Sequence, residues 1–254
     1  MNPFATAAMA EGYARNRPAL HERIVARAAA ALGLESFGDL AVDVGCGSGL
    51  STRALMGRAR RVVGIEPVFE MTTCARAVAP GAHFVQGRGE AMPFGAGTVD
   101  VITAAGSLNY ARPEEVLRET GRVLAEAGLL LVYDFAQGRT FADSGALGEW
   151  YAEFLARYPK PLSEAIPLDA GKVETMAAGL ARVGAEEFRI ALPYEWAAYA
   201  GYMMTETNVA AAMRRGEAES AICEWMAGTL PEVFGGAARD VVFPGYWVAL
   251  RPQQ

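Results

Sequence analysis

Short apolar runs alternate with amphipathic stretches along the first half of the chain. The runs, which are expected to be strands, occur at 40–44, 61–66, 83–86, 99–103 and 129–133. Between them, apolar residues recur at helical spacing, and prolines stand where several of the helices are expected to begin. Continuous apolar strands that alternate with helices are typical of a parallel sheet covered on both faces. With right-handed crossovers, the pattern predicts an α/β fold with a Rossmann-like, doubly wound, mostly parallel sheet.

The second half of the chain is less regular. Asp169 is expected to cap a helix that runs through Val183 and closes at Gly184. Strands are expected at 188–192 and 241–250, which makes the predicted sheet seven-stranded. Pro244-Gly245 interrupts the last of these strands and indicates a bulge or an edge position.

Two aromatic-rich stretches do not fit a minimal sheet-and-helix plan. They span about residues 138–167 and 196–236, and we interpret both as helical cap insertions. The predicted organisation is therefore an N-terminal helical segment or lid over residues 1–34, followed by one α/β domain over 35–254 that carries the insertions.

The composition narrows the classes of protein that remain. Of the 254 residues, 52% are hydrophobic and 20% are charged, so the chain can bury a large core. A net charge of −6 and the lack of a basic run disfavour a nucleic-acid partner. No apolar stretch indicates a signal peptide or a membrane span. The scattered cysteines, Cys46, Cys74 and Cys223, lack metal-ligand spacing and predict reduced thiols in the cytoplasm, with no metal.

The candidate chemistry begins at Asp43–Gly49, which follows an expected strand and precedes an expected helix. Glycines in this place allow a sharp turn and a close approach of the backbone to a ligand. In open α/β sheets, ligands bind beyond the carboxyl ends of the strands. Glu66 ends the next strand and is expected to face the same crevice, where a carboxylate can accept hydrogen bonds from both hydroxyls of a ribose.

The glycine spacing separates two classes of ligand. A dinucleotide site needs G-x-G-x-x-G, whereas here the glycines are at 45, 47 and 49 and position 50 is leucine. Asp43 would also repel a pyrophosphate, but it would attract a ligand that carries an ammonium group. The pattern therefore favours a nucleotide that bears an amino acid.

Asp43–Gly49 resembles the D-x-G-x-G-x-G signature of class I S-adenosylmethionine-dependent methyltransferases. Other family motifs follow in order over about residues 35–135, at Gly64–Pro67 with Met71, Gly87–Phe94, Val99–Ile102 and Arg122–Leu130. The chain is similar to the small-molecule type, such as the trans-aconitate and ubiquinone/menaquinone biosynthesis methyltransferases. It departs from the family pattern at Arg88, where the family usually has an acid that contacts the adenine amino group. In this chain the backbone of Gly89 would have to make that contact.

This resemblance implies a set of cofactor contacts. The residues are Tyr13, Arg17, Asp43, Gly45, Cys46, Gly47, Glu66, Pro67, Met71, Gly89, Glu90 and Ala105. Of the two N-terminal residues, Arg17 would pair with the methionine carboxylate. Glu66 would bind the ribose, Met71 would pack on the adenine, and Ala105 would lie near the transferred methyl group. Of the two histidines, His21 and His83, each is expected to be a surface or strand residue.

The resemblance implies methyl transfer from S-adenosylmethionine to a small organic acceptor. No general base is evident, and the candidates are Tyr110, Asp134 and Glu195. The expected acceptor contacts are Tyr110, Trp150, Tyr151, Tyr202 and Met203. Two alternatives stay open. One is a non-catalytic module that binds S-adenosylmethionine, and the other is an NAD-dependent oxidoreductase, which the glycine spacing disfavours. The sequence does not define the acceptor, the atom methylated or the oligomeric state.

Overall fold

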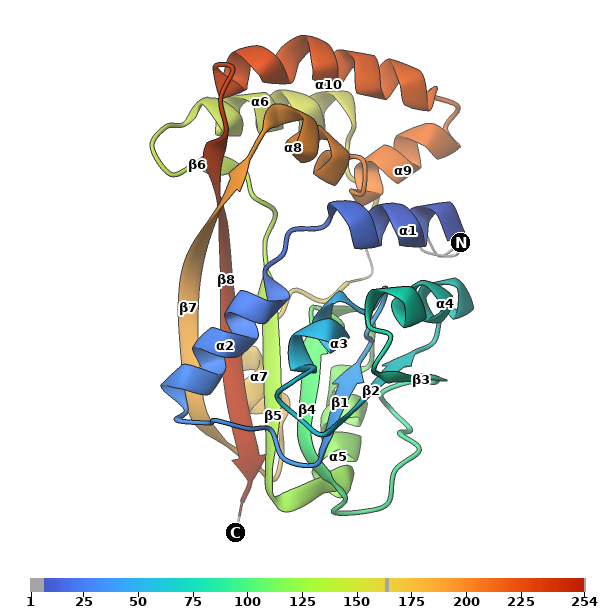
Figure 1. The fold of residues 1–254 in the computed structure, drawn as a ribbon, viewed down its shortest axis with the longest axis vertical. Helices are drawn as coiled ribbons and strands as arrows, with labels where there is room; N and C mark the ends of the chain where they lie inside the picture. The colour runs from blue at the N-terminus through green and yellow to red at the C-terminus, as the bar shows by residue number, and fades with distance from the viewer. Residues whose placement is uncertain (1–6, 163–164, 254) are drawn as a thin grey trace.

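The computed structural model describes residues 7–162 and 165–253, and its centre is one mixed β-sheet (Figure 1). The strands are β1 (Leu40–Val44), β2 (Arg61–Glu66), β3 (His83–Gln86), β4 (Val99–Ala105), β5 (Leu124–Phe135), β6 (Thr140–Phe141), β7 (Leu180–Tyr194) and β8 (Arg239–Pro252). The order is β3-β2-β1-β4-β5-β8, with β6 and β7 also paired to β8. Strands β1 to β5 pair in parallel, and β8 runs antiparallel to its neighbours.

The strands form where the sequence is apolar on both faces. In β5, Leu129, Leu131 and Tyr133 belong to one core cluster, while Leu130 and Val132 belong to a second. Because successive side chains of a strand point to opposite faces, the continuous apolar run requires a cover on each side. The predicted α/β class and mostly parallel sheet are confirmed.

Helices supply both covers (Figure 1). On one side, α3 (Leu50–Leu55) and α4 (Phe69–Val78) contact the first strands, and α2 (His21–Ala31) contacts β8. On the other, α5 (Pro113–Val123) contacts β5, and α7 (Ala170–Met176) contacts β7 and β8. A short 3₁₀ helix, η1 (Leu108–Tyr110), follows β4.

The sheet has eight strands, so the predicted number of seven was wrong. The additional strand, β6, lies within 138–167 and pairs only Thr140 and Phe141 with β8. A two-residue strand leaves almost no periodic signal in a sequence, and it forms because β8 extends past the end of β5 and offers free backbone groups.

The helix expected from Asp169 to Val183 was also too long. It ends at Met176, and Gly179 (φ 80°) turns the chain into β7, which begins at Leu180. From there the backbone pairs with β8 along the whole of β7. Long-range pairing therefore overrides a locally helical pattern, as propensities alone are weak.

Pro244 lies inside the sheet, contrary to the edge position that the sequence indicated. It pairs with Arg189 of β7 on one side, and its carbonyl accepts from Ala136 on the other. Within a strand, the backbone N and O atoms of one residue point to the same side. The nitrogen of Pro244, which carries no hydrogen, therefore points to the gap between the end of β5 and the start of β6. No ladder hydrogen bond is lost there.

The long strands β7 and β8 carry a helical cap beyond the carboxyl ends of β1 to β5 (Figure 1). The cap helices are α6 (Ala146–Arg157), α8 (Trp196–Met203), α9 (Thr207–Arg214) and α10 (Glu219–Phe234). Its interior is aromatic: Trp150 stacks on Phe154 and Trp225 with ring centroids 5.3 Å apart in each pair. The N-terminal helix α1 (Ala7–Asn16) lies between this cap and α4, contacting α4 and α8.

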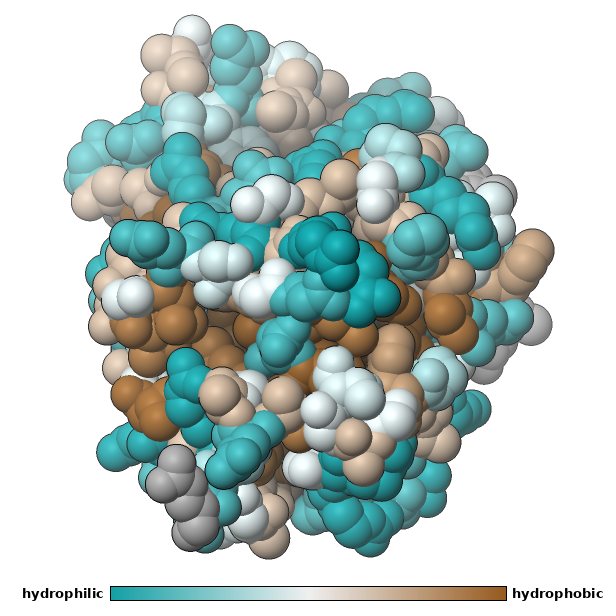
Figure 2. Space-filling model, turned by 60° about the horizontal axis from the view of Figure 1, so that its bottom comes forward, coloured by the Kyte–Doolittle hydropathy of each residue, from teal (hydrophilic) through white to brown (hydrophobic). Residues whose placement is uncertain are grey.

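The surface at the end away from the cap is mixed (Figure 2). Hydrophilic residues dominate the outline of this face, and hydrophobic residues show in a band across its middle. Within residues 7–162 and 165–253, none of the helices combines the length and apolarity that a membrane crossing needs.

The aromatic interior of the cap predicts a large cost for truncation. Phe154 is 0% exposed, and its replacement by alanine is expected to lower the free energy of unfolding by about 3–5 kcal/mol. Chemical denaturation measures the change. Leu162→Ala, at a fully exposed apolar side chain, is the control and should change stability by less than about 0.5 kcal/mol. A loss below about 1 kcal/mol for Phe154→Ala would contradict the packing described.

Candidate functional site

A buried carboxylate lies beneath the loop between β1 and α3. Asp43 is 0% exposed, and its Oδ2 accepts from the hydroxyls of Ser51 and Thr52 at 2.7 Å. Its Oδ1 accepts from Thr103 of β4 at 2.9 Å. Burial raises the pKa of Asp43, and the three hydroxyls oppose that rise. The carboxylate of Asp43 faces hydroxyls of the protein. Any electrostatic attraction between Asp43 and the ammonium group of a ligand would therefore act across the loop and not through direct contact.

The glycines of this loop have two different tasks. Gly45 (φ 68°) would place a Cβ 2.4 Å from Cβ of Ser107, whose hydroxyl donates to the carbonyl of Val44 at 2.6 Å. Gly45 therefore lets β1 and the segment after β4 approach each other. At Gly47 (φ 52°), a Cβ would meet nothing within 4 Å. Its backbone borders open space, as a loop that cradles a ligand must.

Glu66, at the end of β2, binds the glycine loop directly. Its Oε2 accepts from the backbone N–H of Gly47 at 3.0 Å, and its Oε1 accepts from that of Val68 at 2.9 Å. The residue is 7% exposed, and burial raises its pKa, helped by the charge of Asp43 and opposed by the two N–H groups. The carboxylate is thus positioned at the carboxyl end of β2, with lone pairs left for further donors.

These observations fit S-adenosylmethionine better than a pyrophosphate. Gly47 leaves a cradle that a Cβ would fill, and two carboxylates lie around the loop. A sulfonium or ammonium group is attracted by this charge, and a pyrophosphate is repelled. Burial and both carboxylates raise the pKa of Cys46, so its thiol is neutral at pH 7.

The other expected cofactor residues surround the same crevice. Pro67 follows Glu66 directly, and Met71, on α4, is 4% exposed. Gly89 packs so closely on β1 that a Cβ would lie 2.5 Å from Val44 Cγ1. Ala105 pairs with Tyr133 at the end of β4. For these residues, as for Glu90, whose Oε1 accepts from the N–H of Arg112 at 3.2 Å, the contact with a cofactor stays a prediction.

Arg17 joins the N-terminal segment to the cap. Its Nη1 lies 3.2 Å from Oε1 of Glu206, and its guanidinium stacks over Tyr13 at 4.3 Å and Tyr202 at 5.6 Å. Its Nε finds no acceptor among the described residues. The pairing with a methionine carboxylate stays a prediction. Glu206 was not anticipated, although an acid directly after the aromatic stretch 196–204 is a usable signal.

His21 is not the surface residue that the sequence indicated. Its Nδ1 lies 3.0 Å from the hydroxyl of Tyr133, and its ring packs edge-on against Tyr133 and Phe135. It also lines a hollow of about 200 Å³ together with Arg17 and Arg53. Burial lowers the pKa of His21 to about 4, assisted by the charges of the two arginines.

The three candidate bases occupy different environments. Asp134, one residue before the end of β5, accepts from Asn109 Nδ2 and the N–H of Phe135, both at 2.8 Å, and burial raises its pKa. Tyr110 is 69% exposed beside it, and the charge of Asp134 acts on its hydroxyl. Glu195 directly precedes α8, on the far side of the cap insertion from β5, and its side chain is exposed. Asp134 and Tyr110 are therefore brought together, and Glu195 is not.

The residues that were expected to contact the acceptor also lie in different environments. Trp150 donates its indole N–H to Thr229 at 2.8 Å inside the cap, and Met203 is 0% exposed, so both belong to the cap core. Tyr151 and Tyr202 are equally buried, but neither hydroxyl has a hydrogen-bond partner among the described residues.

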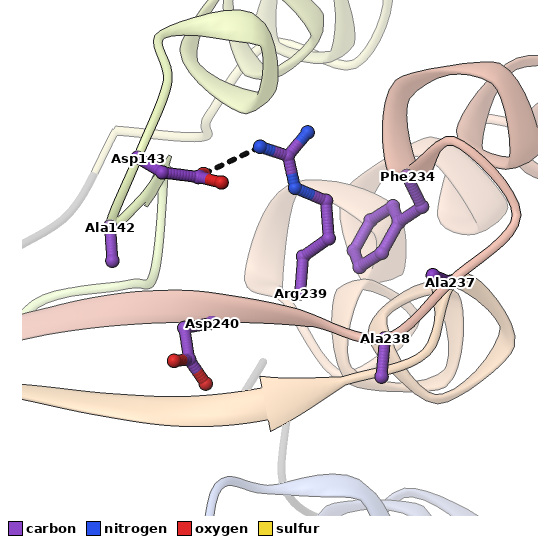
Figure 3. Close-up of a pocket in the computed structure, with 7 residues that line it drawn as sticks. All are labelled: Ala142, Asp143, Phe234, Ala237, Ala238, Arg239 and Asp240. Carbon is purple, nitrogen blue, oxygen red and sulfur yellow. Dashed lines mark hydrogen bonds and ion pairs between the residues drawn. The ribbon is translucent and has the colours of Figure 1, made fainter.

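A second hollow, of about 500 Å³, lies on the cap and away from the glycine loop (Figure 3). It is bordered by the turn after α10 and by Asp143, which forms an ion pair with Arg239. Within the described ranges, no group of three or more His, Cys, Asp or Glu side chains is arranged to hold a metal.

Comparisons with known proteins agree with this geometry. The methyltransferase domain family matches residues 42–132. The chain is 32% identical over 89 residues to an uncharacterised methyltransferase of Mycobacterium bovis, covering 35% of this chain and 37% of the relative. It is 36% identical over 116 residues to the ubiquinone/menaquinone biosynthesis C-methyltransferase of Azotobacter vinelandii, covering 45% and 41%. The match thus spans less than half the length of either relative.

A solved structure agrees over a longer span. A protein of Anaeromyxobacter dehalogenans, described as a type II methyltransferase, is 21% identical with a TM-score of 0.71, covering 94% of this chain and 99% of that one. The likeness shows a common fold. Residues 42–132 therefore match the methyltransferase domain family, and the cofactor of such methyltransferases is S-adenosylmethionine.

The partly buried position of His21 predicts a pH dependence of stability. In the unfolded chain, this residue binds a proton near its ordinary pKa of 6.5, whereas in the folded protein it does so only near pH 4. Because the unfolded state binds more protons in that window, His21 lowers stability progressively from about pH 6.5 to pH 4. Melting temperatures from pH 7.5 to 4.5 should fall less steeply for His21→Gln than for the wild type. Parallel curves would contradict the burial described.

Proposed function

We propose that this protein transfers the methyl group of S-adenosylmethionine to a small organic acceptor. The observation that carries this proposal is the joint geometry of Gly47 and Glu66. The open space at Gly47 adjoins the Glu66 carboxylate, which accepts from the Gly47 N–H at 3.0 Å. Bound there, S-adenosylmethionine supplies an electrophilic methyl group on a positively charged sulfur.

The chain's own residues would then bind and orient. Glu66 would accept hydrogen bonds from the two ribose hydroxyls, each worth about 1.5–3 kcal/mol because the acceptor is charged. The backbone of Gly45 and Gly47 would border the methionine moiety, with Arg17 near its carboxylate. The segment after Ala105 would border the acceptor. Orientation of this kind contributes about 7–11 kcal/mol to lowering a barrier, so a dedicated base is not obligatory.

The cap supports a small acceptor. It covers the carboxyl ends of the parallel strands with α6, α8, α9 and α10, and it closes toward α1 (Figure 1). A polymer would need an open, basic groove, whereas this chain has a net charge of −6. The Azotobacter vinelandii relative is named for C-methylation of a small molecule, which is the same class of acceptor. The cytoplasmic location expected from the cysteines stays a prediction.

The ribose carboxylate gives a direct test. Glu66→Ala is expected to weaken S-adenosylmethionine binding at least about tenfold, since it removes two charge-assisted hydrogen bonds and releases the Gly47 N–H. Isothermal titration measures the affinity. Glu187→Ala, an exposed carboxylate on β7, is the control and should bind as the wild type does. Unchanged affinity of Glu66→Ala would show that the ribose site is elsewhere.

Turnover distinguishes an enzyme from a module that only binds the cofactor. Incubation with S-adenosylmethionine and a panel of phenols, carboxylates and amines is expected to release S-adenosylhomocysteine with at least one acceptor. The Gly47→Asn variant puts a side chain into the open cradle with a residue type that tolerates the φ of 52°, so it should lose that release while keeping its fold. Tight cofactor binding without release on any member of the panel would favour the module. Absorbance from a nicotinamide cofactor that stays bound to the purified protein would favour the oxidoreductase.

A further inference from the structure

Strand β7 leaves one side of the sheet open. Among the described residues it pairs with β8 alone, and no further strand lies beyond it at the left border of the sheet (Figure 1). The edge is long, at 15 residues, whereas the outer strands β3 and β6 have four and two residues. A free edge presents a row of unpaired N–H and C=O groups to which another strand can add. An open edge of this length is therefore a place where two chains can pair.

The backbone groups that face the open edge follow from the pairing of β8. The carbonyl of Pro244 accepts from the N–H of Ala136, on the side away from β7. Pro244 pairs with Arg189 of β7. In an antiparallel pair, the backbone groups of two opposed residues either bond each other or both point outward. Because those of Pro244 point away from β7, the N–H and C=O of Arg189 point to the open edge.

Two other residues of β7 agree with this assignment. The carbonyl of Ala191 lies 3.5 Å from Arg23 Nη1 of α2, so a side chain outside the sheet reaches it. Pro193 has no N–H, and by alternation its nitrogen also points to the open edge, where no bond of the sheet is lost. The outward N–H and C=O groups at alternate positions from Ala185 to Ala191 are therefore available to a further strand.

This edge carries two charges of opposite sign. Glu187 and Arg189 are two residues apart, so their side chains lie on the same face, and both are exposed. Within residues 7–162 and 165–253, neither side chain has an ion-pair partner, whereas the neighbouring Glu186 pairs with Arg27. An acid and a base at this spacing are complementary to the same strand turned end for end.

One register of two antiparallel copies of β7 satisfies both charges. With the twofold axis at Phe188, Glu187 of each copy opposes Arg189 of the other, and Ala185 opposes Ala191. Every opposed pair of this set exchanges backbone hydrogen bonds, and opposite charges directly across the strands stabilise the pairing. A shift of the axis by one residue in either direction would place two glutamates or two arginines opposite each other.

We propose that this chain forms a homodimer in which the two copies of β7 pair antiparallel about a twofold axis at Phe188, which joins the two sheets into one. Such an interface uses the same surface on both subunits. Pairing through one strand buries a small area, so a dissociation constant in the micromolar range is expected. The glycine loop is not part of the interface, because β4, β5 and β8 separate β1 from β7. Dimerisation therefore holds or fails independently of the proposed methyl transfer.

Analytical ultracentrifugation over a series of protein concentrations tests the dimer. The wild type is expected to shift from monomer to dimer as the concentration rises. Glu187→Arg and Arg189→Glu each place like charges opposite each other in both pairs, and each should weaken the dimer at least about tenfold. Glu153→Arg, the same charge change at an exposed position of α6, is the control and should dimerise as the wild type does. A wild type that stays monomeric at about 200 μM would overturn the proposal.

A mixture of the two variants separates loss of pairing from loss of fold. Glu187→Arg leaves two positive charges on the edge, and Arg189→Glu leaves two negative charges. An equal mixture is therefore expected to form a heterodimer, although neither variant dimerises alone at the same concentration. A mixture that stays monomeric, or single variants that dimerise as tightly as the wild type, would overturn the proposal.

The backbone contribution is tested without a change of charge. Ala191→Pro removes an outward N–H that no bond within the described chain uses, so the melting temperature of the monomer should be nearly unchanged. The dimer loses that hydrogen bond at both ends of the paired segment and should weaken at least about tenfold. A proline variant that folds and dimerises as tightly as the wild type would show that the subunits meet elsewhere.

Discussion

The site depends on one buried charge, the carboxylate of Asp43 beneath the glycine loop. Its hydrogen bonds from Ser51, Thr52 and Thr103 join β1, α3 and β4 at a single point. A buried carboxylate without such donors would cost several kcal/mol, so the three hydroxyls are a condition of the fold in this place. Because the carboxylate fixes the base of the loop, the backbone above it can keep the open turn at Gly47.

A second set of constraints comes from the far end of the chain. The N-terminal segment and the cap meet through Arg17 and Glu206, separated by nearly the whole methyltransferase domain in sequence but 3.2 Å apart in the structure. In the same cap, the buried hydroxyls of Tyr151 and Tyr202 have no hydrogen-bond partner among the described residues. One ion pair thus fixes the N-terminal segment against the cap.

The parts of the protein that the sequence predicted are those with local signals. The strands of the parallel sheet and the glycine loop follow from apolar runs and glycine spacing, and Glu66 lies where the strand pattern placed it. What could not be predicted depends on long-range pairing: β6 exists only because β8 is long, and β8 draws Leu180–Tyr194 into β7. The burial of His21 against Tyr133 and the pairing of Glu206 with Arg17 likewise require contacts between distant segments.

The proposed function places a sulfonium nucleoside against the glycine loop and Glu66, at the carboxyl ends of β1 and β2. A crystal structure of the complex with S-adenosylhomocysteine tests it most directly. The account predicts both ribose hydroxyls within hydrogen-bond distance of the Glu66 carboxylate, and the homocysteine moiety along the backbone of Gly45 and Gly47. A nucleoside bound anywhere else, or a crevice that stays closed by its own side chains at saturating ligand, would contradict it.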